Sequence, residues 1–286
     1  MQKSLKTNAL IFSFFIIALT VILIYQQGLH GEFIFDDHGN IEQNSHIQIT
    51  QLNINTLSNS AWSGSAGPLK RPVAMLSFAL NYYFADGHHY TALKATNLAI
   101  QITCAWLLFI FYLQILQLPS VKKNNAIKSK TLPLIAFSIA LLWAVHPINL
   151  TSVLYIVQRM TSLSTLFTLA TLIFYLKARS NTHPSSFKNI LFYSASIISF
   201  LFAIFSKENA LLIHCYCLLI EWAFFYQASP WTFFNALSKR SKWIIWLSLG
   251  LLTLVIGVYA LDYASHGYGN RSFTLIERVL TESRVI

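Results

Sequence analysis

A pair of adjacent carboxylates, Asp36 and Asp37, is the feature of the sequence that points most directly to chemistry. The pair lies in the stretch FIFDDHGNI, directly after the apolar residues Phe33, Ile34 and Phe35. Asp-Asp-His-Gly-Asn is also typical of a solvated turn, which is the structural interpretation of the pair. The preceding hydrophobic residues favour a position against a membrane, where a carboxylate is costly to bury unless it is paired. Because neighbouring carboxylates repel each other, one of them could hold a raised pKa and act as a general base, or the two could bind a cation.

Several cationic and polar side chains are predicted to lie on the same side of the protein as this pair. They are Lys70, Arg71, Lys94, His146, Gln158, Arg159, Lys207 and Glu208. Each also has a structural interpretation, because a lysine stem can cover apolar surface, a His-Pro pair can end a helix, and a Ser-Lys-Glu run can begin one. Together they suit a substrate that carries a phosphate, bound by Arg and Lys, beside a hydroxyl or amine that a carboxylate activates.

The sequence predicts no cofactor with certainty. A divalent cation could bind Asp36, Asp37 and His38, but adjacent residues of a turn rarely point at one ion. The three cysteines all lie within apolar runs, and two of them are only two positions apart on a predicted helix, so they point in different directions. We therefore expect free thiols rather than a disulfide or a metal site.

The composition places these residues in a membrane protein. Hydrophobic residues make up 55% of the chain and charged residues only 10%, whereas soluble domains carry roughly 25% charged residues. A membrane span needs about 20 mainly apolar residues, and the apolar runs that qualify are 9–26, 93–115, 132–146, 161–178, 189–205, 209–226 and 243–261. The net charge of +10 does not require nucleic acid, because the basic residues lie in short loops between these runs. We therefore predict an all-α polytopic membrane protein with about seven spans.

The distribution of charge predicts which loops face the cytoplasm. If the N-terminus is inside, the cytoplasmic segments 1–8, 116–131, 177–188 and 227–242 hold 12 of the 20 basic residues and no acidic residue. The acidic residues then fall on the exterior side, except Glu221 within the sixth predicted span. This orientation makes a long exterior loop of residues 27–92, which contains the acid pair.

Within that loop, the run RPVAMLSFALNYYF at residues 71–84 is apolar but too short to span a membrane. Pro72 suits the first turn of a helix, and Tyr82 and Tyr83 suit the boundary between water and lipid. The loop is therefore predicted to be a partly helical cap that lies on the membrane face and carries the acid pair near its start.

Five motifs follow one another along the chain: FIFDDHGNI, RPVAMLSFALNYYF, LKATNL, HPINLTSVLYIVQRMTSLSTLF and SKENALL. In this order and with this spacing, they resemble bacterial membrane proteins of the GT-C glycosyltransferase superfamily. The nearest branch is that of the transmembrane, tetratricopeptide-repeat O-mannosyltransferases and their bacterial pilin-glycosylating relatives. The resemblance implies a seven-span GT-C-like module over residues 1–261. It also implies that residues 262–286 begin a second exterior loop and that further spans and a repeat domain would follow.

The resemblance further implies the substrates and the location. The donor would be a sugar linked to polyprenyl phosphate, and the acceptor a protein or glycan, such as pilin or another exported protein. Transfer would take place on the periplasmic face of a bacterial inner membrane. A direct displacement at the anomeric carbon would invert that centre, with polyprenyl phosphate as the leaving group.

Matched motif by motif, the resemblance makes Asp36 or Asp37 the catalytic base. The residues expected to bind substrate or phosphate, or to anchor the loop, are Arg71 of the RP motif, Lys94 of K-x-x-N, His146 of HPINL, Arg159 of YI-x-x-R, and Lys207 and Glu208 of SKE.

Two other classes of protein compete with this interpretation. A transporter or lipid flippase would place ionisable residues and broken helices at mid-membrane, whereas Glu221 is the only acid within a predicted span. A non-catalytic membrane component of a pilus or secretion assembly would need no acid pair, so its function would survive substitution of both aspartates.

Overall fold

The computed structural model describes residues 2–124, 131–181 and 187–226, together with isolated positions from Gly250 onward. These residues form helices and connecting turns, with no strand in the described ranges. The contacts divide the chain into two units, Met1–Gln227 and Ala228–Ile286, and the fold described below is that of the first unit.

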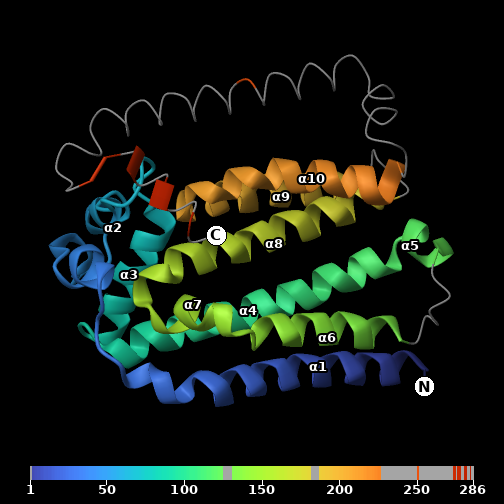
Figure 1. Ribbon diagram of the computed structural model, residues 1–286, viewed down its shortest axis with the longest axis horizontal. Coiled ribbons are helices and arrows are strands. Elements are labelled where there is room, and N and C mark those ends of the chain that lie inside the picture. Colours follow the sequence, from blue (N-terminus) through green and yellow to red (C-terminus); the bar gives the residue numbers. More distant parts are fainter. Residues whose placement is uncertain are drawn as a thin grey trace. The chain divides into compact units, whose positions relative to one another are not determined.

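Long helices run side by side and form a bundle (Figure 1). They are α1 (Gln2–Tyr25), α4 (Tyr90–Gln117), α6 (Leu132–Ala144), α8 (Arg159–Arg179), α9 (Phe187–Ser206) and α10 (Ile213–Ile220), with η7 (Glu221–Tyr226) continuing α10. In the described ranges, five helical segments are long and apolar enough to cross a membrane, or six if a bent pair counts as one span. The prediction of an all-α polytopic membrane protein is confirmed. The seventh predicted span, 243–261, lies outside the described residues except for Gly250, as does the predicted module boundary near residue 261.

The bent pair corresponds to the third predicted span. After α6, the short helices η4 (Pro147–Asn149) and α7 (Leu150–Leu154) continue at an angle of 53°. Pro147 causes the break, because its ring and its missing N–H disrupt a continuous helix. His146 begins the new turn, since its Nδ1 accepts a hydrogen bond from the backbone N–H of Ile148 at 3.2 Å.

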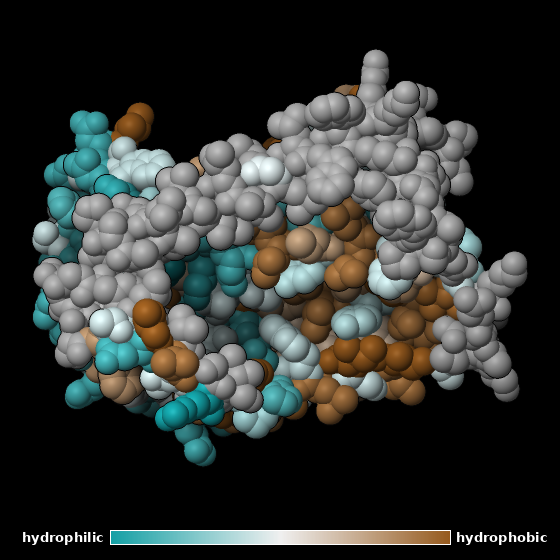
Figure 2. Space-filling view, turned by 45° about the horizontal axis from the view of Figure 1, so that its top comes forward, coloured by the Kyte–Doolittle hydropathy of each residue, from teal (hydrophilic) through white to brown (hydrophobic). Residues whose placement is uncertain are grey.

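The long loop between α1 and α4 folds into a cap segment, residues 31–89, at one end of the bundle (Figure 1). It contains η2 (His38–Glu42), η3 (Ser45–Ile47), α2 (Ile54–Ala61) and α3 (Pro72–Ala85). The helix predicted at 71–84 is confirmed, and Pro72 occupies its first turn. On the face shown in Figure 2, hydrophilic side chains are concentrated at this end and hydrophobic side chains over the bundle.

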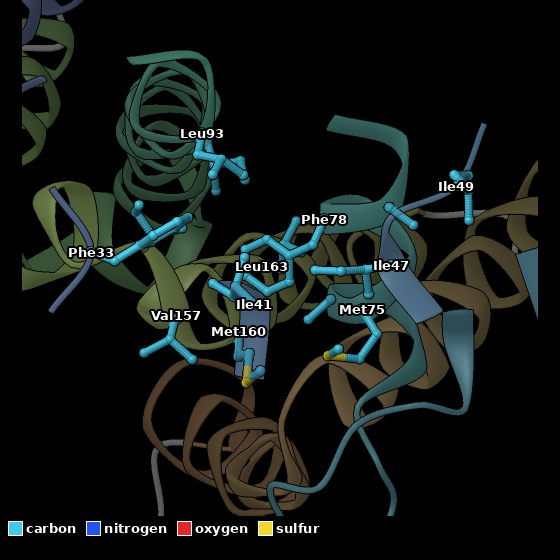
Figure 3. Close-up of a cluster of buried hydrophobic side chains, with 14 of the residues drawn as sticks. Phe33, Ile41, Ile47, Ile49, Met75, Phe78, Leu93, Val157, Met160 and Leu163 are labelled. Atoms are coloured by element: carbon cyan, nitrogen blue, oxygen red, sulfur yellow. The ribbon is translucent and has the colours of Figure 1, made fainter. Parts of the chain in front are cut away.

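A hydrophobic core joins the cap segment to the bundle (Figure 3). Phe33, Ile41 and Ile47 of the cap segment pack with Met75 and Phe78 of α3. Leu93 of α4 and the residues at the start of α8, Val157, Met160 and Leu163, complete the same cluster. The start of the cap segment is therefore fixed against the ends of α4 and α8, which is where the candidate site lies.

Glu221, the one acid that departs from the predicted charge pattern, has polar partners at the end of the bundle opposite the cap segment. Glu221 accepts a hydrogen bond from the Tyr175 hydroxyl at 2.6 Å and pairs with Arg179 at 2.8 Å. The Arg179 guanidinium also lies 4.5 Å from the ring centroid of Phe225. Glu221 is therefore neutralised by a cation from a segment that the charge distribution assigns to the cytoplasm.

The packing of α6 predicts the effect of enlarging one of its alanines. Ala136, Ala140 and Ala144 are fully buried and spaced four residues apart, which lets α6 approach its neighbours closely. Ala140→Leu should lower the free energy of unfolding by about 1–3 kcal/mol through overpacking, measured as a lower thermal midpoint in detergent. Leu142→Ala is the control, because this side chain is 68% exposed on the same helix. Equal midpoints for the two variants would contradict this account of the packing.

Candidate functional site

The two aspartates of the predicted acid pair have opposite environments. Asp37 is fully buried, and its carboxylate accepts hydrogen bonds from the backbone N–H of Val157 at 2.7 Å and of Ile34 at 3.3 Å. Its Val157 contact places a negative charge at the start of η5 (Ile156–Gln158), where it is favourable to the helix dipole. Burial raises the pKa of Asp37, and it outweighs the lowering by these hydrogen bonds and by the charge of Lys94. Asp37 therefore ties the cap segment to the start of α8.

Asp36 is exposed, in contrast. Its backbone N–H donates to the hydroxyl of Tyr155 at 3.1 Å, and its carbonyl accepts from the Asn40 side chain at 3.0 Å. Burial raises the pKa of Tyr155, and the negative charges of Asp36 and Asp37 raise it further, while the hydrogen bond from the Asp36 backbone opposes the shift. Tyr155 therefore stays protonated at neutral pH beside the exposed Asp36.

Phe35, directly before the pair, has an unusual conformation. Its backbone lies in the left-handed region with φ 46°, and its side chain is 82% exposed. Its ring meets Tyr155 edge-on, with centroids 6.4 Å apart. A left-handed conformation costs a non-glycine residue about 1–2 kcal/mol, so the fold imposes this orientation against the local preference of the chain.

The side chains of Asp36, Asp37 and His38 diverge. Asp36 faces outward and Asp37 inward, while the Nδ1 of His38 lies 2.6 Å from the carboxylate of Glu42. In the described part of the chain, no three His, Cys, Asp or Glu side chains are grouped as metal ligands. Cys104, Cys215 and Cys217 are not joined in a disulfide, and Cys104 is buried while Cys215 is exposed.

Lys94, predicted to bind substrate, is 4% exposed. Its Nζ lies 3.5 Å from the carbonyl of Gly28, and a Cβ added to Gly31 would come within 2.8 Å of the same nitrogen. Lys94 therefore fills a narrow space between the end of α1 and Asp37, and it acts as the counter-charge of Asp37 rather than as an open phosphate ligand.

Arg159 is also placed differently from the predicted phosphate ligand, because it is fully buried at the start of α8. Its Nε donates to Asn97 at 2.7 Å, and its Nη2 donates to Asn81 and to the carbonyl of Leu93, each at 2.8 Å. Its Nη1 donates to the carbonyl of Ser77 at 3.1 Å, and the guanidinium lies 4.4 Å from the ring centroid of Phe78. All three nitrogens thus bind the protein, and Arg159 joins α8 to α3 and α4.

Arg71, Lys207 and Glu208 meet at the neighbouring face of α8. Arg71 forms an ion pair with Glu208 at 3.1 Å, and its Nη1 contacts the sulfur of Met160. Lys207 donates to the hydroxyl of Thr161 at 2.7 Å. Burial lowers the pKa of Lys207, Arg71 lowers it further, and Glu208 opposes the shift. Two cations and one carboxylate leave this cluster with a net positive charge.

The predicted residues therefore fall into two groups that the start of α8 connects. Tyr155 contacts Asp36, and Thr161 contacts Lys207. Tyr155 and Thr161 are six positions apart, which corresponds to an advance of about 10 Å along a helix. Asp36 and the cationic cluster therefore contact two places that lie about 10 Å from each other. None of the hydrogen bonds or ion pairs that link these described residues involves His146, which lies exposed at the break after α6.

Sequence reasoning missed Tyr155 and Thr161 as partners of the candidate residues, and it missed the network around Arg159. Asn97 is the clearest signal that could have revealed that network, because a fully buried amide in an apolar helix requires a polar partner. Tyr155 offers no comparable signal, since tyrosines are common at membrane boundaries.

Comparison with known proteins supports a distant relationship to protein O-mannosyl-transferases. The chain is 25% identical over 183 residues to the human protein O-mannosyl-transferase TMTC4, covering 60% of this chain and 24% of that protein. It is 29% identical over 167 residues to the Caenorhabditis elegans protein O-mannosyl-transferase F38B6.6, covering 55% of this chain and 22% of that protein. The chain thus spans about a quarter of the length of these relatives.

No family profile and no solved structure matches the chain. The similarity to the O-mannosyl-transferases is distant and partial, and it supports a glycosyltransferase-like relationship.

The environment of Asp37 predicts a pH dependence of stability. Because its folded-state pKa is raised, the folded protein keeps this proton to a higher pH than the unfolded chain does. Ionisation of buried Asp37 therefore lowers the free energy of unfolding progressively as pH rises from about 4 through the folded-state pKa. The thermal midpoint of Asp37→Asn minus that of the wild type should rise across this window. A difference that stays constant or falls with pH would contradict the assignment.

Proposed function

We propose that the protein is a membrane glycosyltransferase that moves a sugar from polyprenyl phosphate to a protein or glycan acceptor at the cap end. The observation that carries the proposal is that one exposed carboxylate residue, Asp36, and a net positive cluster contact the same segment at the start of α8, through Tyr155 and Thr161. The named relatives support transfer of a sugar to protein, since they are called protein O-mannosyl-transferases.

Asp36 is the proposed general base, because it is the exposed member of the pair. Its carboxylate takes the proton of the acceptor hydroxyl as the hydroxyl oxygen attacks the anomeric carbon. A carbon–oxygen bond forms there while the bond to the phosphate oxygen breaks, and its electron pair leaves with the phosphate. One displacement inverts the anomeric centre. Asp37 takes no proton in this scheme and instead holds the turn in place through Val157.

Arg71 and Lys207 are the proposed phosphate ligands. Cations stabilise the negative charge that develops on a leaving phosphate, most strongly where water is excluded. Glu208 holds Arg71 by an ion pair, and the negative charge of a phosphate at this place would oppose the burial and the repulsion from Arg71 that lower the pKa of Lys207.

An apolar groove beside the cations supports a lipid-linked donor. Its volume is about 280 Å³ and it is lined by Trp62, Pro72, Val73, Ile198, Leu201, Phe202 and Phe205. Pro72 directly follows Arg71, and Phe205 lies two residues before Lys207. A prenyl chain in this groove would therefore place its phosphate end toward the two cations.

The charge distribution supports the proposed orientation. The described parts of three Lys- and Arg-rich segments, 2–8, 116–124 and 177–181, lie at the end opposite the cap segment (Figure 1). The positive-inside tendency therefore favours an exterior position for the proposed site, in the periplasm if the membrane is a bacterial inner membrane. The acceptor would then be an exported protein such as a pilin.

Replacing the proposed base tests the reaction. Asp36→Asn should lower the transfer rate by about 10²–10⁴-fold without changing the thermal midpoint, since the side chain is exposed. Transfer is measured by mass spectrometry of exported proteins from cells that make each variant. Glu32→Gln is the matched control, because it removes an exposed acid of the same cap segment. Full transfer by membrane-inserted Asp36→Asn would exclude the assigned role and favour a non-catalytic membrane component.

Replacing a proposed phosphate ligand tests donor binding. Lys207→Met should raise KM for the lipid-linked donor by about tenfold and leave KM for the acceptor unchanged, because one charge-assisted contact is worth about 1.5 kcal/mol. Lys122→Met removes an exposed lysine at the opposite end of the bundle and serves as the control. Equal donor KM values for the two variants would exclude a phosphate contact by Lys207.

A further inference from the structure

We propose that Phe35 and Tyr155 form an aromatic wall that binds a pyranose ring beside Asp36. This inference rests on the proposed function, because it assigns a place to the sugar that the reaction transfers or extends. It concerns residues that neither the acid pair nor the phosphate cluster explains.

The first observation is that Phe35 is held outward at a cost. Phe33 is buried in the core and Asp37 is buried against Val157, while Phe35 between them is 82% exposed. Hydrogen bonds fix the backbone around Phe35. The Asp37 N–H donates to the carbonyl of Ile34 at 3.0 Å, and the His38 N–H donates to the carbonyl of Phe35 at 3.3 Å. Strained residues of this kind persist where the surrounding structure determines them, and they cluster at functional sites. Glycine would adopt φ 46° without conflict, so a large ring here calls for a role of the ring itself.

The second observation is the geometry around that ring. Phe35 meets Tyr155 at an angle of 79°, so the two rings make a corner. The Tyr155 hydroxyl receives the backbone N–H of Asp36, which places the exposed carboxylate next to this corner.

A pyranose fits these features because it has an apolar face of C–H bonds and a rim of hydroxyl groups. The apolar face packs on the electron-rich face of an aromatic ring, and the hydroxyls bond to polar groups at its edge. The corner offers both, with a tyrosine hydroxyl and a carboxylate at the edge of two rings. The sugar could belong to the donor or to a glycan on the acceptor, and the experiment below distinguishes the two.

The test measures binding by the purified full chain in detergent with three probes. These are citronellyl phosphate mannose, citronellyl phosphate, and methyl α-mannopyranoside. Phe35→Gly should weaken binding of at least one mannose-containing probe by about three- to tenfold, the usual range for an aromatic contact. Binding of citronellyl phosphate should not change, and the thermal midpoint should equal or exceed that of the wild type, because glycine relieves the strain. Phe35→Trp, which restores a ring, should bind the probes within about twofold of the wild type.

Phe84→Ala is the matched control, because Phe84 is another exposed aromatic of the cap segment, at 76% exposure. If Phe35→Gly binds citronellyl phosphate mannose more weakly than the wild type does, the occupant is the donor sugar. If only its binding of methyl α-mannopyranoside is weaker, the occupant is an acceptor sugar. Either result supports the wall.

Three results would contradict the proposal that Phe35 and Tyr155 bind a sugar. They are unchanged binding of both mannose probes by Phe35→Gly, an equal loss in Phe84→Ala, and a lower thermal midpoint or misfolding of Phe35→Gly. The first removes the contact, the second indicates general contact with lipid or detergent, and the third makes Phe35 structural. Failure of the wild type to bind either citronellyl probe would instead contradict the proposed donor, while the methyl α-mannopyranoside arm would still test the wall. If the wild type binds none of the three probes, both the proposed donor and the proposed aromatic wall are wrong.

Discussion

The buried guanidinium of Arg159 is the interaction on which the rest of the site depends. A charge removed from water is tolerated only when its hydrogen-bonding groups find partners, and Arg159 satisfies this condition with Asn97, Asn81, Ser77 and Leu93. These partners belong to α3 and α4, so the first turn of α8 can take only one position relative to both helices. The residues on either side of Arg159 then contact the acid pair and the cationic cluster from fixed places.

The same requirement separates structural charges from candidate reactive ones. Asp37 faces Lys94, and Arg71 pairs with Glu208, so each of these buried or partly buried charges has an opposite charge nearby. Asp36 is exposed, and the hydrogen-bond partner of Lys207 is the neutral hydroxyl of Thr161. Asp36, to which we assign proton transfer, and Lys207, which we assign to phosphate binding together with Arg71, are therefore the groups whose charge the fold compensates least directly.

The environment of the site also suits a substrate with both polar and apolar parts. The cap segment presents a hydrophilic surface (Figure 2), while the groove beside Arg71 and Lys207 is lined by apolar side chains of α3 and α9. A lipid-linked sugar phosphate combines such parts in one molecule, because a hydrocarbon chain is followed by a charged phosphate and then by a hydroxylated ring. The proposed groove, cation pair and aromatic wall would meet these parts in that order.

The sequence by itself determined the membrane class, the places of five long apolar helices and of the bent α6 segment, and the helix of the cap segment, because hydropathy and proline placement act locally along the chain. It also identified the residue types of the candidate site, but it could not tell Asp36 from Asp37 or recognise that Arg159 and Lys94 are enclosed by protein. Only the tertiary structure decided these points. Burial and pairing join residues far apart in the sequence, such as Asp37 with Val157, 120 positions away, and Arg71 with Glu208, 137 positions away. The electrostatic environment of a charged side chain depends on such contacts, which no local pattern of the sequence specifies.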